Sequence, residues 1–229
     1  MTTDVKYYGI PGRGEAVRLM LKLKGTKYTE TYIDSKTWKA GEKENTKWNV
    51  MPVITLENGQ VAGMSRSILR YIAKTTYVEG NPLYPTDPND ALVVDEVMDF
   101  LGEDIWMEML KSVGEKNGEE IAKNTLASGG KAFLQLNELE KNIEGTDSTL
   151  KNGNLSVADI YIYAAIGWYS SGFMTKETNA QSLFTGRPKL SAICTRVGAL
   201  AAVKAHQTDA NNKIAMKQAY MTAPWSSKL

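Results

Sequence analysis

The 229-residue sequence contains very little cysteine and histidine: one residue of each, Cys194 and His206. A lone cysteine excludes an intramolecular disulfide framework and a Cys-x-x-Cys redox centre, and it fits a reducing compartment. His206 has no second histidine or cysteine close to it in the sequence. We therefore expect a surface histidine there rather than a metal ligand, and we predict no metal centre.

An excess of charge and long apolar runs are absent as well. The formal net charge is +1, so no long-range field attracts nucleic acid or an anionic membrane. No apolar run approaches the ~18 residues of a membrane span, and the N-terminal residues do not have the layout of a signal peptide. Hydrophobic residues make up 42% and charged residues 23% of the chain, which is ordinary for a globular protein.

A change in composition divides the chain into two parts. Periodicity predicts strands at 4–8, 28–33, 53–56 and 60–62, with helices at 14–24 and 65–74. The first three elements suit a right-handed parallel crossover, and Asn58-Gly59 suits a hairpin turn. A stretch rich in proline, glycine and asparagine follows, and beyond it we find only helical patterns. We therefore predict an α/β domain over 1–78, a linker over 79–89 and an all-helical domain over 90–229.

The segment from Val5 to Arg18 holds the side chains best suited to chemistry. A predicted strand ends in Tyr7 and Tyr8, a loop of glycine and proline follows, and Arg13 precedes a helix. These parts can place a phenol, a guanidinium and free backbone N–H groups around one concavity, which would hold a small anion. Because neighbouring strand residues point to opposite faces, only one of the two tyrosines can face such a site.

Several short motifs follow one another along nearly the whole chain. They are Tyr7 with Arg13 and Arg18, Met51-Pro52-Val53, Asn58-Gly59, Ser65-x-x-Ile68-x-Arg70-Tyr71, Asp90-Ala91 with Asp95 and Asp99, Ser156-x-Ala158-Asp159, and Arg187-Pro188-Lys189-Leu190. In this order and spacing the chain resembles the cytosolic glutathione transferases of the tyrosine type, and it is most like the sigma class. The resemblance implies a thioredoxin-like α/β N-terminal domain followed by an all-α helical-bundle domain. It also implies glutathione as co-substrate, small electrophiles as second substrates and a homodimer.

The resemblance assigns the activation of the glutathione thiol to Tyr7. A free thiol has a pKa near ~8.5, so only a few per cent is ionised at neutral pH. Lowering that pKa by about 2 units takes roughly 2.7 kcal/mol, and one hydroxyl donor in a dry pocket can supply much of it. The spacing to Arg13 and Arg18 favours Tyr7 over Tyr8, which would then lie beside the pocket of the second substrate. Arg13 would bind the peptide or brace the loop, with a solvated arginine as the alternative.

Further residues are implied to bind glutathione. Met51 would precede a cis proline, Pro52, and pair through its backbone with the cysteinyl residue. Ser65 would bind the γ-glutamyl carboxylate at a helix N-terminus, unless it is a plain helix cap. The predicted glutathione-binding residues are Tyr7, Arg13, Trp38, Lys43, Met51, Pro52, Met64, Ser65 and Asp99.

The two ends of the peptide would be held by different groups. Trp38 and Lys43 would hold the glycine end, with Lys39 or Lys47 as alternatives to Lys43 and an ordinary polar loop as the alternative to both. Asp99 would reach the γ-glutamyl amine from across a dimer interface, unless it is a solvated helix acid. If Asp99 acts in this way, the complete site requires a homodimer.

The chain departs from the family pattern at three places. Pro11 stands where the family has arginine, Met64 where it commonly has glutamine, and Val50 where it often has glutamine or lysine. These departures keep open a non-catalytic ligand carrier or structural protein of the same fold. A glutathione-dependent isomerase of the prostaglandin synthase type is a third possibility, and a thiol-disulfide oxidoreductase is disfavoured because the N-terminal domain has no cysteine.

An apolar surface is expected for the second substrate, although such side chains are more often simply core. It would consist of Tyr8, Ile10, Trp106, Met109 and Leu110, with Trp225 closing it.

We expect a cytoplasmic location. The chain ends in Ser227-Lys228-Leu229, a tripeptide that acts as a peroxisomal address, so peroxisomal import is the alternative.

Overall fold

The first part of the molecule is a small mixed sheet with helices on one face. The computed structural model describes residues 1–113, 115–170 and 183–209. The strands are β1 (Thr3–Tyr7), β2 (Tyr28–Tyr32), β3 (Val53–Thr55) and β4 (Val61–Ala62). Their order is β2-β1-β3-β4, and β1 is parallel to β2 and antiparallel to β3. The predicted parallel crossover and the β3–β4 hairpin are therefore confirmed.

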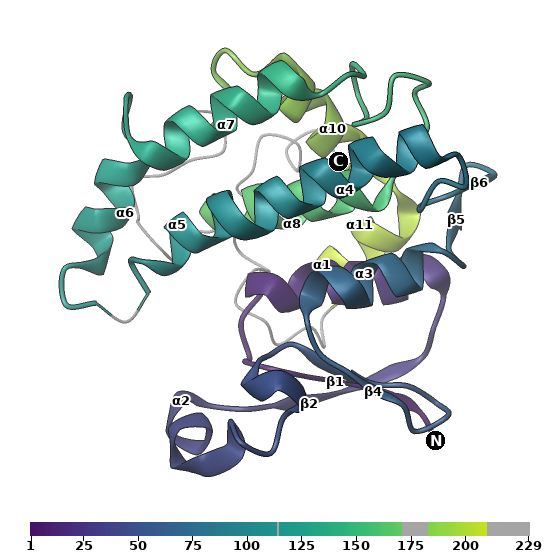
Figure 1. Cartoon of the computed structure of the whole chain (residues 1–229), viewed down its shortest axis with the longest axis vertical. Coiled ribbons are helices and arrows are strands. Elements are labelled where there is room, and N and C mark those ends of the chain that lie inside the picture. The colour runs from purple at the N-terminus through teal and green to yellow at the C-terminus, as the bar shows by residue number, and fades with distance from the viewer. Residues whose placement is uncertain (114, 171–182, 210–229) are drawn as a thin grey trace.

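Helices α1 (Gly12–Lys24) and α3 (Ser65–Ala73) lie between this sheet and the helical part of the molecule (Figure 1). The predicted polar stretch after β2 forms a short helix α2 (Ser35–Thr37), a π turn (Trp38–Glu42) and a 3-10 turn (Lys47–Asn49). Val17, Met20 and Leu21 face the core from α1. The loop between β1 and α1, from Tyr8 to Pro11, therefore leads from the sheet toward the helical part of the molecule.

The rest of the described chain is helical apart from one small hairpin. The hairpin, β5 (Tyr77–Val78) with β6 (Asn81–Pro82), precedes the long α4, so the segment predicted as a linker holds a strand. The helical elements are α4 (Pro88–Phe100), a π turn η3 (Leu101–Ile105), α5 (Trp106–Leu110), α6 (Gly118–Leu126), α7 (Lys131–Asn142), α8 (Val157–Tyr169), α10 (Pro188–Ala199) and α11 (Ala201–Thr208). The predicted fold class, a thioredoxin-like α/β domain followed by an all-α domain, is confirmed. Within the described ranges, no helix is both long enough and apolar enough to cross a membrane.

Helix α8 is the centre of the helical part. Every residue from Val157 to Tyr169 is buried, and the helix contacts α1, α3, α4 and α10. A helix that is apolar on all sides is stable only where other elements surround it. Helix α8 therefore joins the helical layer to the α/β layer.

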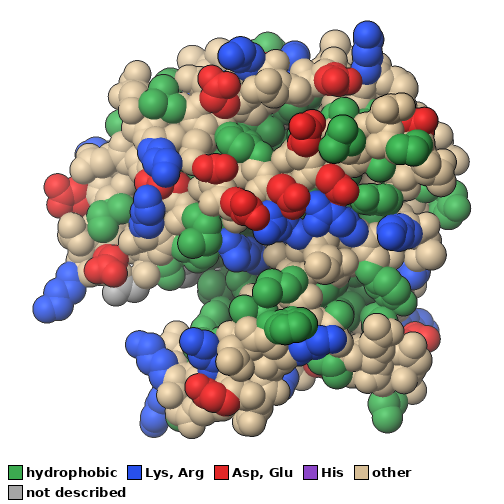
Figure 2. All heavy atoms as spheres, viewed as in Figure 1, with side chains coloured by type: hydrophobic (Ala, Val, Ile, Leu, Met, Phe, Trp, Pro, Cys, Tyr) green, Lys and Arg blue, Asp and Glu red, His purple; other side chains and the backbone are tan. Residues whose placement is uncertain are grey.

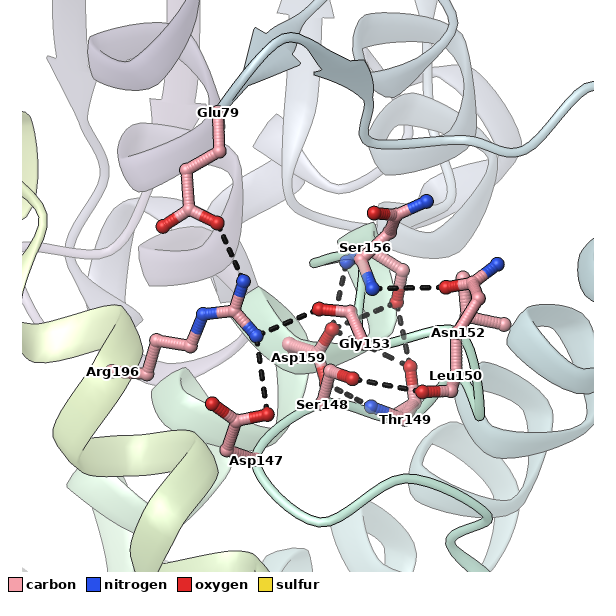
Figure 3. Close-up of polar contacts among 11 residues, drawn as sticks. Glu79, Asp147, Ser148, Thr149, Leu150, Asn152, Gly153, Ser156, Asp159 and Arg196 are labelled. Carbon is pink, nitrogen blue, oxygen red and sulfur yellow. Dashed lines mark hydrogen bonds and ion pairs between the residues drawn. The ribbon is translucent and has the colours of Figure 1, made fainter.

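A polar network fixes the start of α8 (Figure 3). The Ser156 hydroxyl accepts a hydrogen bond from Ala158 N at 3.2 Å, and the Asp159 carboxylate accepts one from Ser156 N at 2.7 Å. The predicted capping box is therefore present. Arg196 of α10 pairs with Asp147 in the loop before α8 and with Glu79 beside β5. These contacts hold the loop and the interdomain segment against the helical core.

The prediction that His206 lies on the surface is wrong. Its side chain is 4% exposed, and its Nε2 atom lies 2.8 Å from Oε1 of Glu15, which is 1% exposed. Glu15 also pairs with Arg18 at 3.4 Å. Burial opposes the ionisation of Glu15, but the charges of His206 and Arg18 outweigh it and hold the pKa of Glu15 below its usual value. This buried cluster joins α11 to α1, so His206 is a structural residue between the two parts.

Candidate functional site

Tyr7 ends β1 with its ring packed against the start of α1. Along β1, Thr3, Val5 and Tyr7 are the buried residues, as strand alternation requires. A Cβ atom on Gly12 would lie 2.5 Å from the Tyr7 hydroxyl oxygen, and one on Gly14 would lie 2.5 Å from Cδ1 of the ring. Both positions must therefore be glycine for the ring to lie here. The sequence analysis did not identify this role for the two glycines.

The hydroxyl of Tyr7 is held as an acceptor and keeps its proton. Its oxygen accepts a hydrogen bond from the backbone N–H of Arg13 at 3.0 Å. Burial raises the pKa of Tyr7, and the Arg13 N–H and the charges of Arg18 and Arg13 only partly oppose this. Among the described residues no acceptor is found for the Tyr7 O–H group. The phenol is therefore a protonated donor at neutral pH, free to serve a ligand.

Tyr8 follows the last residue of β1 and is more exposed than Tyr7. It is half-buried, and its ring meets that of Trp38 edge-to-face with centroids 6.3 Å apart. The ring centroids of Tyr7 and Tyr8 are 5.6 Å apart. The three rings of Tyr7, Tyr8 and Trp38 therefore form a chain of contacts, and partial burial raises the pKa of Tyr8.

The two arginines of the opening segment have different surroundings. Arg18 is buried, pairs with Glu30 at 2.7 Å, and donates to the carbonyls of Tyr8, Ile10 and Pro11, so it holds the loop. The guanidinium of Arg13 reaches across to the helical part, where it donates to Gly102 O at 3.2 Å. The Nε atom of Arg13 is buried without a hydrogen-bond partner.

A cleft of about 250 Å³ lies between the two parts. This is just below the ~300–1,000 Å³ usual for small-molecule sites, so the cleft accommodates part of a tripeptide. It brings together Arg13, Met51, Met64, Ser65 and Asp99 of the predicted glutathione-binding residues, whereas Tyr7, Trp38, Lys43 and Pro52 are not in its lining. The lining residues are Arg13, Val50, Met51, Met64, Ser65, Arg66, Ser67, Arg70, Asp99, Gly102, Glu103 and Tyr161.

Two backbone features lie at the cleft, one beside Met51 and one beside Ser65. The Met51–Pro52 bond is cis, as predicted. Ser65 is the first residue of α3, and the cap position is Met64, which has φ 67° and makes no side-chain capping bond. The plain helix-cap alternative for Ser65 therefore does not apply. The positive end of α3 is left without a capping side chain at the cleft.

Acidic and basic side chains gather where α3 meets α4 (Figure 2). Asp99 pairs with Arg66 at 3.0 Å and with Arg70 at 2.9 Å, while Arg70 also pairs with Asp95 and Arg66 with Glu103. The Asp99 side chain is 53% exposed, so each of these pairs contributes little to stability. The sequence analysis identified Asp99 but not Arg66, which holds it.

Comparison with known proteins agrees with this geometry. No family model matches the sequence. A glutathione S-transferase from Antechinus stuartii is 24% identical over 213 residues, covering 88% of this chain and 86% of the relative. A prostaglandin synthase D structure from Nilaparvata lugens superimposes with a TM-score of 0.74 at 20% identity, covering 92% of this chain and 98% of that one. The chain has the glutathione S-transferase fold.

A second structure with this fold contains glutathione itself. A glutathione transferase homologue from sulfitobacter, with bound glutathione, has a TM-score of 0.69 at 16% identity and covers 89% of this chain and 96% of that one. In this chain the cleft is lined by residues from the start of α3, from α4 and η3, and from α8.

The other predicted site residues are not among those that line the cleft. Trp38 is half-buried and Lys43 is exposed, while Lys47 donates to Val61 O at 3.0 Å. Trp106 is only 1% exposed and stacks on Tyr161. Ile10 is partly buried against the core, and Leu110 is 41% exposed. Of the other predicted groups, the Met109 side chain, Trp225 and Ser227-Lys228-Leu229 lie outside the described part.

Tyr161 of α8 lines the cleft and was not predicted. It is fully buried, and its hydroxyl has no hydrogen-bond partner. Burial raises the pKa of Tyr161 to about 12. A weak indication existed in the sequence, because Tyr161 is one of three tyrosines in a largely apolar helix, and a buried tyrosine hydroxyl usually has a hydrogen-bond partner.

Proposed function

We propose that the chain is a glutathione transferase of the tyrosine type, most like the sigma class, that adds the glutathione thiolate to small hydrophobic electrophiles. The observation that carries this proposal is the Tyr7 hydroxyl, which is fixed by the Arg13 N–H at 3.0 Å and retains its own proton as a donor. A hydrogen bond to an anion is worth ~1.5–3 kcal/mol, which covers much of the cost of ionising a thiol at neutral pH.

The reaction needs few protein groups once the thiolate is formed. The thiol proton leaves to solvent, the sulfur forms a bond to the electrophilic carbon, and the leaving group departs with the electrons of the broken bond. The Met51 backbone, beside the cis Pro52, would hold the cysteinyl residue. Ser65 and the Met64 backbone would hold the γ-glutamyl end, and Trp38 and Lys43 the glycine end. Tyr8 beside Trp38, with Ile10, Met109 and Leu110, would form the acceptor side, whereas Trp106 is buried and belongs to the core.

A homodimer is part of the proposal, because Asp99 would serve the γ-glutamyl amine of a partner subunit. The exposed carboxylate of Asp99, next to Arg66 and Arg70, is suited to a surface between two copies.

We also propose a cytoplasmic location, with peroxisomal import through Ser227-Lys228-Leu229 as the alternative. Fusing the complete chain, or the chain without this tripeptide, to a fluorescent protein would separate the two locations.

Two alternatives rest on specific observations. The similarity to a prostaglandin synthase D fits a glutathione-dependent isomerase, which would use the same thiolate and a more specialised acceptor pocket. Val50 and Met64 both line the cleft with apolar side chains where the resemblance predicts polar ones, which fits a non-catalytic carrier.

The test is turnover of an aryl halide with glutathione by the wild type and by Tyr7→Phe. We expect the wild type to form the thioether and the variant to lose at least tenfold in kcat, since the phenol donor is removed while the ring remains. Glutathione binding without turnover in the wild type would support the carrier, and unchanged turnover in the variant would refute the role of Tyr7.

A further inference from the structure

One side chain of the helical part lies at the cleft with an unsatisfied polar atom. Tyr161 on α8 is fully buried, and its hydroxyl has no hydrogen-bond partner. The Ser65 hydroxyl lies beside it and lowers its pKa slightly, but the two do not meet the geometry of a hydrogen bond. Buried polar groups are nearly always paired, so an unpaired hydroxyl lining a cleft points to a ligand.

A second unsatisfied donor lines the same cleft. The Nε atom of Arg13 is buried without a partner, although the far end of its guanidinium is anchored on Gly102 O. The charge of Arg13 acts on the Tyr161 hydroxyl, so the two groups lie near each other. Four buried side-chain atoms are unpaired in the described ranges, and two of them belong to these cleft-lining residues.

The neighbouring end of α3 favours an anion. Met64 provides no side-chain cap, so Ser65 and the following N–H groups face the cleft with the positive end of the helix dipole. A carboxylate accepts about four hydrogen bonds, which is more than Ser65 alone can donate. Tyr161 lines the cleft together with Ser65, whereas Tyr7 is not among the lining residues, and this is the reason to assign Tyr161 to the anion site at α3.

We infer that the Tyr161 hydroxyl donates a hydrogen bond to the γ-glutamyl carboxylate of bound glutathione, alongside Ser65 and Arg13 Nε. This inference rests on the proposed function, since it adds a residue from the helical domain to that same site. Tyr161 is a binding residue, and its loss changes the affinity for glutathione and leaves the ionisation of the bound thiol unchanged.

The first experiment measures glutathione binding by calorimetry in the wild type, Tyr161→Phe and Tyr169→Phe. We expect the Kd of Tyr161→Phe to rise about tenfold, the lower end of what a hydrogen bond to a charged group provides. Its unliganded Tm should not fall, because the hydroxyl makes no bond in the free protein. Tyr169→Phe is the matched control on the same helix: its hydroxyl donates to Ile105 O at 3.3 Å, so this variant should lose Tm and keep its Kd.

A second ligand tests which group of glutathione accepts the hydrogen bond from Tyr161. The probe is 4-aminobutanoyl-cysteinylglycine, which keeps the amine and the thiol of glutathione but lacks the γ-glutamyl carboxylate. It should bind to the wild type and to Tyr161→Phe equally. An equal loss of affinity for both ligands, or a changed pKa of the bound thiol, would overturn the assignment to the carboxylate. An unchanged Kd for glutathione would overturn the inference alone, whereas no binding by the wild type would overturn the proposed function with it.

Discussion

The close packing of Tyr7 on α1 predicts that Gly14→Ala impairs the reaction without touching any substrate. The added methyl group would lie 2.5 Å from Cδ1 of Tyr7, whereas ordinary contacts begin at 3.4 Å, a shortfall of 0.9 Å (3.4 − 2.5). The ring has little room to yield, because Tyr7 is only 8% exposed. We therefore expect the hydroxyl to move by about 1 Å, a displacement that can cost ~100-fold in rate.

Stability should change less than activity in this variant. Overpacking costs ~1–3 kcal/mol, but alanine is favoured over glycine inside a helix by roughly 1 kcal/mol. Gly12→Ala is a poorer probe because its φ of +43° adds backbone strain. The measurements are kcat with an aryl halide and the Tm.

Gly9→Ala is the matched control. Gly9 lies in the loop between β1 and α1, and its added Cβ would come no closer than 3.8 Å to another residue, at Cδ1 of Tyr32. We expect this variant to keep its kcat. In a Tyr7→Phe background, Gly14→Ala should cause no further loss of kcat, because the hydroxyl that it displaces is already absent. An equal loss in both backgrounds would refute the reasoning.

Two further predictions concern charged groups. Glu15→Gln should lower the Tm at pH 7, because the pKa of Glu15 in the folded protein lies below its usual value. The ionised carboxylate therefore stabilises the fold above about pH 4.5, and this stabilisation is lost as the pH falls. The Tm of the variant should then depend less on pH between 3 and 5 than that of the wild type, and an equal dependence in both proteins would contradict this. Asp99→Asn should raise the KM for glutathione several-fold with little change in kcat, and the wild type should sediment as a dimer. A monomeric wild type, together with an unchanged KM in the variant, would contradict the role of Asp99 across the interface.

The sequence predicted those features that depend on neighbouring residues. The parallel crossover and the hairpin were predicted because each is encoded within a few residues, and the cis Pro52 was predicted because the family resemblance implies it. The burial of Tyr7 fits the strand alternation, whereas the roles given to Tyr7 and Tyr8 stay predictions.

Contacts between distant segments could not be predicted. His206 is buried because a residue 191 positions away, Glu15, meets it when α11 packs on α1. Gly12 and Gly14 lie in the first turn of α1, and only the position of the Tyr7 ring reveals their role. Tyr161 reaches the cleft because α8 packs against α1 and α3, and no local pattern encodes that contact.

The central claim is that the Tyr7 hydroxyl stabilises the glutathione thiolate. It is tested most directly by titrating the ultraviolet absorbance of the thiolate in complexes of glutathione with the wild type and with Tyr7→Phe. The account predicts a bound thiol pKa about 2 units below the free value of ~8.5 in the wild type and a value close to the free one in the variant. An equally low thiol pKa in both proteins would contradict it.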